Sequence, residues 1–165
     1  MIKQFLVLAL FAMPFLAQAQ VIPPETDQST EFRKSIFGLG ISGGPATGLG
    51  ISFRHHLPSP FSYQVIGGIV NVSGRLLYDI GGDIQYDVIR SSAGRFFIAG
   101  GAAYFYAARH GENNVMEAPG RLGVGLGGEF AKIPGVHSQV ELMFTYFSDG
   151  TILPLPQLGL HYYFN

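Results

Sequence analysis

The segment Arg75–Val88, RLLYDIGGDIQYDV, decides the fold class, because its pattern can be counted with the period of a helix or of a strand. Six of its seven even positions are apolar or aromatic, and five of its seven odd positions are polar. Alternation with period two is typical of a β-strand, and the pair Gly81-Gly82 in the middle would weaken a helix. The segment is therefore predicted to be a strand with one apolar and one polar face.

The same alternation recurs along the chain, and clusters of Gly, Pro and Ser separate the alternating segments. Each segment is close to or above the length of about 9–11 residues that a tilted strand needs to cross a bilayer. The sequence therefore predicts an all-β fold, an eight-stranded antiparallel up-and-down transmembrane barrel over residues 34–165. The predicted strands are 34–43, 47–56, 62–71, 75–89, 95–109, 119–132, 137–147 and 155–164.

The beginning of the chain has the features of a secretory signal peptide. A positively charged start precedes the apolar run 5–17, and the A-Q-A sequence at 17–19 is typical of a cleavage site. The run is too short for a membrane helix, which needs about 20 residues. We therefore expect a signal peptide at 1–19, cleaved after Ala19, and a polar periplasmic lead at 20–33.

Composition and charge exclude several classes of protein. The chain has 23 Gly, 14 Phe and 8 Tyr, no Trp or Cys, and only 13% charged residues. Its net charge of −1 argues against a nucleic-acid partner, because such partners require a basic face. The sequence contains no P-loop or HExxH motif and no cysteine cluster, so no cofactor or metal is expected. Apart from the α-helix, the closed β-barrel is the structure that can span a bilayer.

The two faces of the predicted strands indicate which side of the wall meets lipid. One face carries Leu, Ile, Val, Phe and Tyr, and the other carries Gly, Ser, Gln, His and the charged residues. The lumen of an eight-stranded barrel is just wide enough for its own side chains, so the apolar face is expected to point outward. The alternative is a soluble periplasmic barrel. Aromatic residues near the strand ends would form interfacial girdles: Phe37, Phe53, Tyr63, Phe96, Tyr106, Phe130, Tyr146, Tyr162 and Phe164.

The signal peptide, the eight alternating strands and the final LGLHYYFN (158–165) resemble the small outer-membrane barrels of Gram-negative bacteria, the OmpA and OmpX kind. Members of that group typically end in an outward aromatic residue, which Phe164 matches, although Asn165 follows it. The resemblance implies a monomer in the outer membrane, inserted by the barrel-assembly machinery and in contact with outer-membrane lipids such as lipopolysaccharide. It also implies that both termini are periplasmic, so the connections after the odd-numbered strands face outward.

The three aspartates of the opening segment lie four residues apart, which on a strand is a separation of roughly 13 Å. They cannot share one metal ion or form an acid–base pair, whose carboxyls lie within about 5–9.5 Å. We expect them to face the lumen and to pair with basic residues of other strands. The predicted lumen network consists of Lys34, Arg54, Asp79, Asp83, Asp87, Arg95, Glu129, Glu141 and His161.

Folding the strands about their turns suggests partners within this network. Asp87 is expected near Arg95, Glu129 opposite Glu141, and Glu141 near His161. Adjacent carboxylates raise one another's pKa, so Glu129, Glu141 and His161 could form a catalytic group. The lumen leaves little room for a substrate, and no catalytic residue is assigned.

Three arginines are predicted to stand side by side at the outer rim of the barrel: Arg75, Arg109 and Arg121. Such a group would bind a phosphate or carboxylate, for example on a lipopolysaccharide or an acidic ligand. The alternative is that Asp79 and the acids of the 110–119 connection neutralise them.

Some small outer-membrane barrels remove acyl chains from lipid A, and that kind carries a His-x-Ser pair near its penultimate strand. Here Tyr146 stands where the histidine would precede Ser148, and a serine without an adjacent base is not activated. A wide aqueous pore would need about 16 strands. The predicted function is therefore a structural or surface-interaction role without catalysis. The alternatives are a lipid-modifying enzyme and a barrel that binds a small solute or an anionic ligand.

Overall fold

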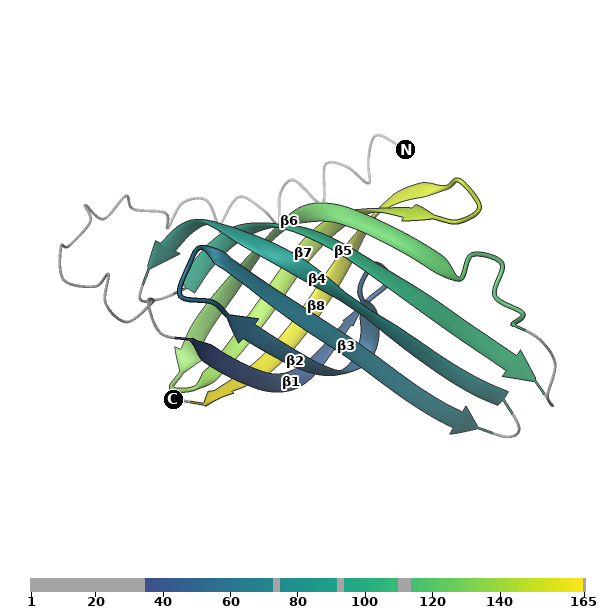
Figure 1. The fold of residues 1–165 in the computed structure, drawn as a ribbon, viewed down its shortest axis with the longest axis horizontal. Coiled ribbons are helices and arrows are strands. Elements are labelled where there is room, and N and C mark those ends of the chain that lie inside the picture. The colour runs from purple at the N-terminus through teal and green to yellow at the C-terminus, as the bar shows by residue number, and fades with distance from the viewer. Residues whose placement is uncertain (1–34, 73–74, 92–93, 110–113, 165) are drawn as a thin grey trace, which may run out of the picture.

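The computed structural model describes residues 35–72, 75–91, 94–109 and 114–164. In these residues eight antiparallel strands follow one another around a closed barrel, and the last pairs with the first (Figure 1). The predicted fold class is confirmed. The strands are β1 (Ile36–Gly44), β2 (Gly48–His56), β3 (Phe61–Val72), β4 (Arg75–Ser91), β5 (Gly94–Arg109), β6 (Gly120–Ile133), β7 (Val136–Phe147) and β8 (Ile152–Phe164).

The strand bounds lie within two residues of the predicted ones, except that β8 begins three residues early, at Ile152. Pro154 and Pro156 make this segment look like a break in the sequence. The structure accommodates both prolines because β1 pairs with β8 only from Leu158 onward, which leaves one side of the strand without a neighbour. The expected signal peptide, the periplasmic lead and Lys34 lie outside the described residues.

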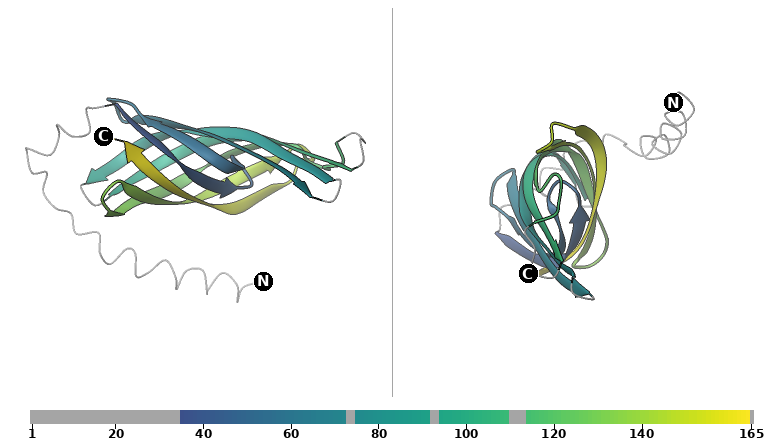
Figure 2. Two further views of the ribbon diagram at one scale, coloured as in Figure 1. Left: turned by 90° about the horizontal axis from the view of Figure 1, so that it is seen from below. Right: turned by 90° about the vertical axis from the view of Figure 1, so that its right-hand side faces the viewer.

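The two ends of the barrel differ. We call the end that holds Ile36 and Phe164 the terminal end and the opposite one the loop end (Figure 1). Seen from the loop end, the strands form a closed ring (Figure 2, right). The wall has an uneven height, because β4 and β5 contain 17 and 16 residues, whereas β1 and β2 contain nine each. No helix in the described ranges is long and apolar enough to span a membrane.

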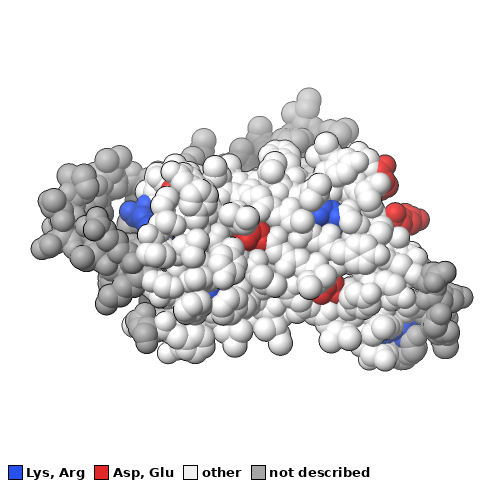
Figure 3. Space-filling model, in the orientation of Figure 1, with Lys and Arg blue, Asp and Glu red and all other residues white. Residues whose placement is uncertain are grey.

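The outer surface of the barrel is apolar, and the lumen is polar. Ile51 and Val124 point outward and are 67% and 66% exposed, whereas Arg54 and Glu129 point inward and are 0% and 2% exposed. Few charged residues interrupt the face that Figure 3 shows. Water-soluble proteins have the reverse distribution of apolar and charged side chains, and a large exposed apolar surface marks contact with a membrane. The prediction that the apolar faces of the strands point outward and the polar faces point into the lumen is therefore confirmed.

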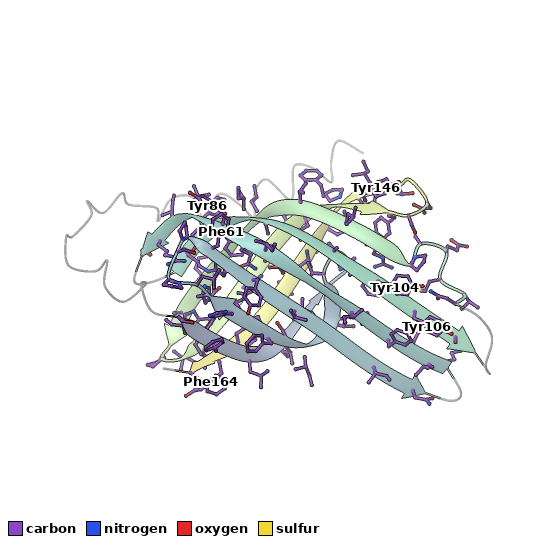
Figure 4. The ribbon with its side chains drawn as sticks, viewed as in Figure 1. Phe61, Tyr86, Tyr104, Tyr106, Tyr146 and Phe164 are labelled. Atoms are coloured by element: carbon purple, nitrogen blue, oxygen red, sulfur yellow. The ribbon has the colours of Figure 1, made fainter. Side chains whose placement is uncertain are left out.

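Aromatic side chains mark both limits of the apolar surface. Neighbouring rings pair across the strands, with centroids 5.1 Å apart for Phe61 and Tyr86 and 4.6 Å apart for Tyr78 and Tyr106. Two such groups, one toward each end, have the arrangement of interfacial girdles. The residues labelled in Figure 4 are Phe61, Tyr86 and Phe164 toward the terminal end and Tyr104, Tyr106 and Tyr146 toward the loop end.

The connection between β1 and β2 differs from the expected outer loop. Its residues Pro45–Thr47, which we call the inserted turn, bend into the lumen, where Ala46 and Thr47 are 0% and 1% exposed. Glycines on the facing strands make room for them. A Cβ atom on Gly101 would lie 2.6 Å from Thr47 Cγ2, and one on Gly123 would lie 2.8 Å from Ala46 Cβ. The turn therefore occupies the volume that these glycines leave free.

The lipid-facing wall gives a first prediction. Leu126 is half-exposed near the middle of β6, so Leu126→Arg should lower the free energy of unfolding in vesicles by about 2–4 kcal/mol. Ile133→Arg, at the terminal end of the same strand, is the matched control and should cost about 0–1 kcal/mol. Urea titration of the refolded proteins measures both values. Equal effects at the two positions would contradict a lipid-facing β6.

Candidate functional site

The lumen near the terminal end contains an ionic cluster, which consists of Arg54, Asp87, Arg95 and Glu129. Glu129 is its centre: Oε2 accepts hydrogen bonds from Arg54 Nη1 at 2.7 Å and from Arg95 Nη2 at 2.6 Å. Its other oxygen, Oε1, lies 2.8 Å from His137 Nδ1. One buried carboxylate thus binds two guanidinium groups. Charges in such an environment are tolerated only when they are paired and hydrogen-bonded.

Arg95 connects Glu129 to the second acid of the cluster. Its Nη1 donates to Asp87 Oδ1 at 2.6 Å and to Ser62 Oγ at 3.0 Å. Arg90 forms a further ion pair with Asp87, three residues away along β4. A bulge between Asp87 and Ile89 displaces the alternation by one residue, which lets Arg90 reach the same carboxylate. The structure thus places Asp87 beside Arg95, as the sequence suggests.

Glutamine side chains surround the other two lumen acids, Asp83 and Glu141. Gln85 Nε2 donates to Asp83 Oδ1 at 2.8 Å and to Glu141 Oε1 at 3.0 Å, and Gln139 donates to the same Glu141 oxygen. Gln64 accepts a hydrogen bond from Arg54. These amides are absent from the predicted network, although Gln85 and Gln139 occupy the polar face of the alternation. The period-two pattern could therefore have identified them.

Glu129, Glu141 and His161 do not form the catalytic group that the sequence left open. The pairing sets Glu129 opposite Gln139, Glu141 opposite Gln157, and His161 opposite His137. His161 Nε2 lies 2.8 Å from Ser52 Oγ. A one-residue shift of the β6–β7 ladder between Ala131 and Ile133 accounts for part of the two-residue displacement of the partner of Glu129, and the β7–β8 ladder sets the partner of Glu141 separately. Each group has its own partners.

Asp79 lies apart from the ionic cluster and holds the segment that follows the inserted turn. Its Oδ1 accepts a hydrogen bond from the Leu49 amide at 2.7 Å. Two more side chains secure the turn itself: Thr47 donates to Gln157 Oε1, and Arg121 Nη1 donates to the Pro45 carbonyl at 3.2 Å. The lumen is thus filled in two layers, the ionic cluster toward the terminal end and the inserted turn beyond it.

The three rim arginines are not side by side. Arg75 and Arg109 are direct partners in the β4–β5 ladder, whereas Arg121 lies opposite Ala103 on β5 and is therefore six residues from Arg109 along that strand. The connection before β6 causes this offset, because it continues to pair with β5: the Phe105 amide donates to the Pro119 carbonyl at 2.9 Å. Arg121 contacts the inserted turn and is not grouped with the other two.

Ser148 has no histidine partner of the deacylase kind among the described residues. The described histidines, on β2, at the start of β7 and near the end of β8, all lie toward the terminal end, whereas Ser148 follows β7 at the loop end. The adjacent Asp149 accepts a hydrogen bond from the Thr151 amide at 2.8 Å, which lowers the pKa of its carboxyl and stabilises this turn. In the same ranges, no group of three His, Cys, Asp or Glu side chains is arranged to hold a metal ion.

The barrel wall carries a groove of about 500 Å³ on β4 to β7, near the loop end. Most of its lining is apolar. The lining residues are Ile80, Ala102, Ala103, Tyr104, Gly120, Arg121, Leu122, Tyr146 and Ser148.

No protein-family model matches the chain, and comparison with curated proteins gives no significant match. Solved structures that share the general architecture include the outer membrane protein Ail of Yersinia pestis, with 12% identity over 79% of this chain and 98% of Ail, at a TM-score of 0.44. Neisserial surface protein A is 16% identical over 78% of this chain and 91% of its own, at a TM-score of 0.43. The de novo designed protein TMB2.3 is 17% identical over 79% of this chain and 95% of its own, at a TM-score of 0.42. At such identities the likeness concerns the fold alone.

The ionic cluster gives a second prediction. Glu129→Gln should lower the free energy of unfolding by about 3–5 kcal/mol, because it leaves two buried guanidinium groups without their shared carboxylate. Adding Arg54→Met should recover part of this loss, since Arg95 retains Asp87. Glu117→Gln, on an exposed loop, is the control and should change stability by less than about 0.5 kcal/mol. Chemical unfolding in vesicles measures all three variants; a Glu129→Gln effect as small as that of the control would exclude a buried ionic cluster.

Proposed function

We propose that the protein is an integral barrel of a bacterial outer membrane, closed to solutes, with a structural or surface-interaction role and no catalytic activity. The observation that carries the proposal is the combination of an apolar outer wall with a lumen filled by paired side chains. The wall suits lipid, and the paired side chains and the inserted turn within the lumen support a barrel that is closed to solutes.

The closure of the lumen has two independent parts. In the ionic cluster, Arg54 and Glu129 are 0% and 2% exposed, and hydrogen bonds fix them in place. In the second layer, the inserted turn packs against Met143 and Phe97, both 0% exposed. An eight-stranded barrel has just enough space for such side chains, whereas an aqueous channel needs a wider one.

The proposed location and orientation of the barrel are supported by the sequence together with the fold. A secretory signal at 1–19 would export the chain, and the terminal end would then face the periplasm, with the loop end at the cell surface. Insertion would require the barrel-assembly machinery, and the polar lumen with its own partners suits a monomer. Surface interactions in this proposal belong to the loop end.

A lipid-modifying enzyme finds less support in the geometry. The serine at 148 lies at the loop end, and the described histidines lie toward the other end. The carboxylates of the lumen bind arginines or glutamine amides and lie behind the wall. The serine–histidine contact of Ser52 with His161 is buried in the lumen, at 0% and 1% exposure, where no lipid reaches it.

Cell fractionation tests the location. The expressed protein should sediment with the outer membrane, require detergent for extraction, and migrate differently on gels before and after boiling, because the folded barrel resists detergent until heated. The shift in mobility reports the closed barrel and the sedimentation reports the membrane. Recovery in the soluble periplasmic fraction without detergent would refute the proposal and favour the soluble barrel.

Conductance measurements test the closed lumen. Folded protein added to a planar bilayer should produce no steady current steps, because the ionic cluster and the inserted turn both obstruct the lumen. A 16-stranded porin in the same bilayer is the positive control. Reproducible ohmic steps from protein whose gel mobility shows it to be folded would identify a channel.

A further inference from the structure

Four acids are buried in the described part of the lumen, and only two of them form ion pairs. Asp87 and Glu129 bind the guanidinium groups of the ionic cluster. Asp83 and Glu141, which we call the acid pair, are equally buried, at 5% and 2% exposure. No described lysine, arginine or histidine lies within ion-pair distance of either. A carboxylate held away from water without a cation is so costly that the group takes up a proton instead.

One amide nitrogen joins the two members of the acid pair. Gln85 Nε2 lies 2.8 Å from Asp83 Oδ1 and 3.0 Å from Glu141 Oε1, so the two carboxyl oxygens are less than about 6 Å apart. The direction of this amide is fixed, because Gln85 Oε1 accepts a hydrogen bond from Arg95 Nη2 at 2.5 Å. Two acids that share a site in this way favour one ionised and one protonated carboxyl.

A hydrogen-bond acceptor beside Glu141 lacks a donor. Gln139 is 4% exposed and contacts the Glu141 carboxyl through Nε2, and the oxygen of the same amide has no hydrogen-bond partner. A carboxylate only accepts hydrogen bonds, whereas a protonated carboxyl also donates one. A proton on Glu141 therefore supplies a donor next to an amide oxygen that needs one.

The charged groups on the neighbouring strands have partners other than the acid pair. Both guanidinium groups, of Arg54 and Arg95, bind Glu129. His161 lies against Ser52, and His137 against Glu129. The titratable and charged groups that surround the acid pair toward the terminal end are Arg54 and His56 on β2, Asp87 and Arg90 on β4, Arg95 on β5, Glu129 on β6, His137 on β7, and His161 and Tyr163 on β8.

We propose that the acid pair binds one proton at neutral pH, held by Glu141, and that this buried proton is a structural component of the lumen. Glutamate in an unfolded chain has a pKa of about 4.3, so above this pH the folded barrel binds one proton more than the unfolded chain. The stability that the proton contributes is therefore complete in acid and is lost as the pH rises. The site depends on the filled lumen and not on the location of the barrel.

Infrared spectroscopy of the folded protein, in a detergent without ester groups, tests the proton directly. At neutral pH the wild type should show the C=O stretch of a protonated carboxyl. Glu141→Gln should remove this band, whereas Glu117→Gln, on an exposed loop, should leave it unchanged. A wild-type spectrum without the band, or a band that persists in Glu141→Gln, would overturn the proposal.

Urea unfolding at a series of pH values gives an independent measurement. At about pH 8, Glu141→Gln should be at least as stable as the wild type, because the amide replaces a neutral carboxyl of nearly the same shape. Relative to this variant, the folding equilibrium constant of the wild type should fall about tenfold for each pH unit over which the proton is retained, the effect of one proton.

Glu129→Gln is the matched contrast, since it makes the same change in an acid that is ion-paired. It should destabilise the barrel at neutral pH, and equal losses in Glu129→Gln and Glu141→Gln would contradict a neutral Glu141. Chelation of divalent ions and replacement of sodium by a bulky organic cation should change neither readout. Stability that depends on a metal ion would assign the acid pair to that cation and overturn the proton. The heat-dependent gel mobility of each variant shows that the barrel compared is folded.

Discussion

The structure depends on one constraint: in hydrocarbon, backbone N–H and C=O groups must find their hydrogen-bond partners within the protein. A sheet meets this condition when its first strand pairs with its last, as β1 does with β8 from Phe37 to Gly43. Closure then assigns a side to every residue, because alternate side chains point to lipid and to the lumen. The apolar surface, the aromatic girdles and the polar interior all follow from that assignment. The prolines of β8 fall on the one stretch of that strand that β1 leaves unpaired.

Closure also encloses charged side chains in the lumen, away from bulk water. Charged groups withdrawn from water must be compensated, and Glu129 does this for two arginines at once. Charges alone do not fill the remaining length, and there the chain inserts its own turn against glycines of β5 and β6. The ion pairs and the inserted turn thus both fill the lumen, at different depths.

The hollow near the loop end lies on the outer wall, whereas the Arg121 side chain lies on the lumen side of β6. Fold alone does not specify an activity, and the chemistry must come from particular residues. On the outside, Ala102 leaves a depression among larger side chains. The Arg121 guanidinium, by contrast, donates to the Pro45 carbonyl and holds the inserted turn in the lumen.

The sequence by itself determined the eight strands and which face of each meets lipid, because alternation with period two is a local property. Arg75–Val88 showed this most clearly, and its aspartates do face the lumen at different depths. Only the tertiary structure decided which residues meet across strands. A slip of two residues preserves every face, so the pattern cannot distinguish Gln139 from Glu141 as the neighbour of Glu129. For the same reason, the sequence could not show that Arg121 lies six residues from Arg109 along β5. The inward bend of Pro45–Thr47 depends on glycines that are distant in the sequence and come close only in the closed barrel.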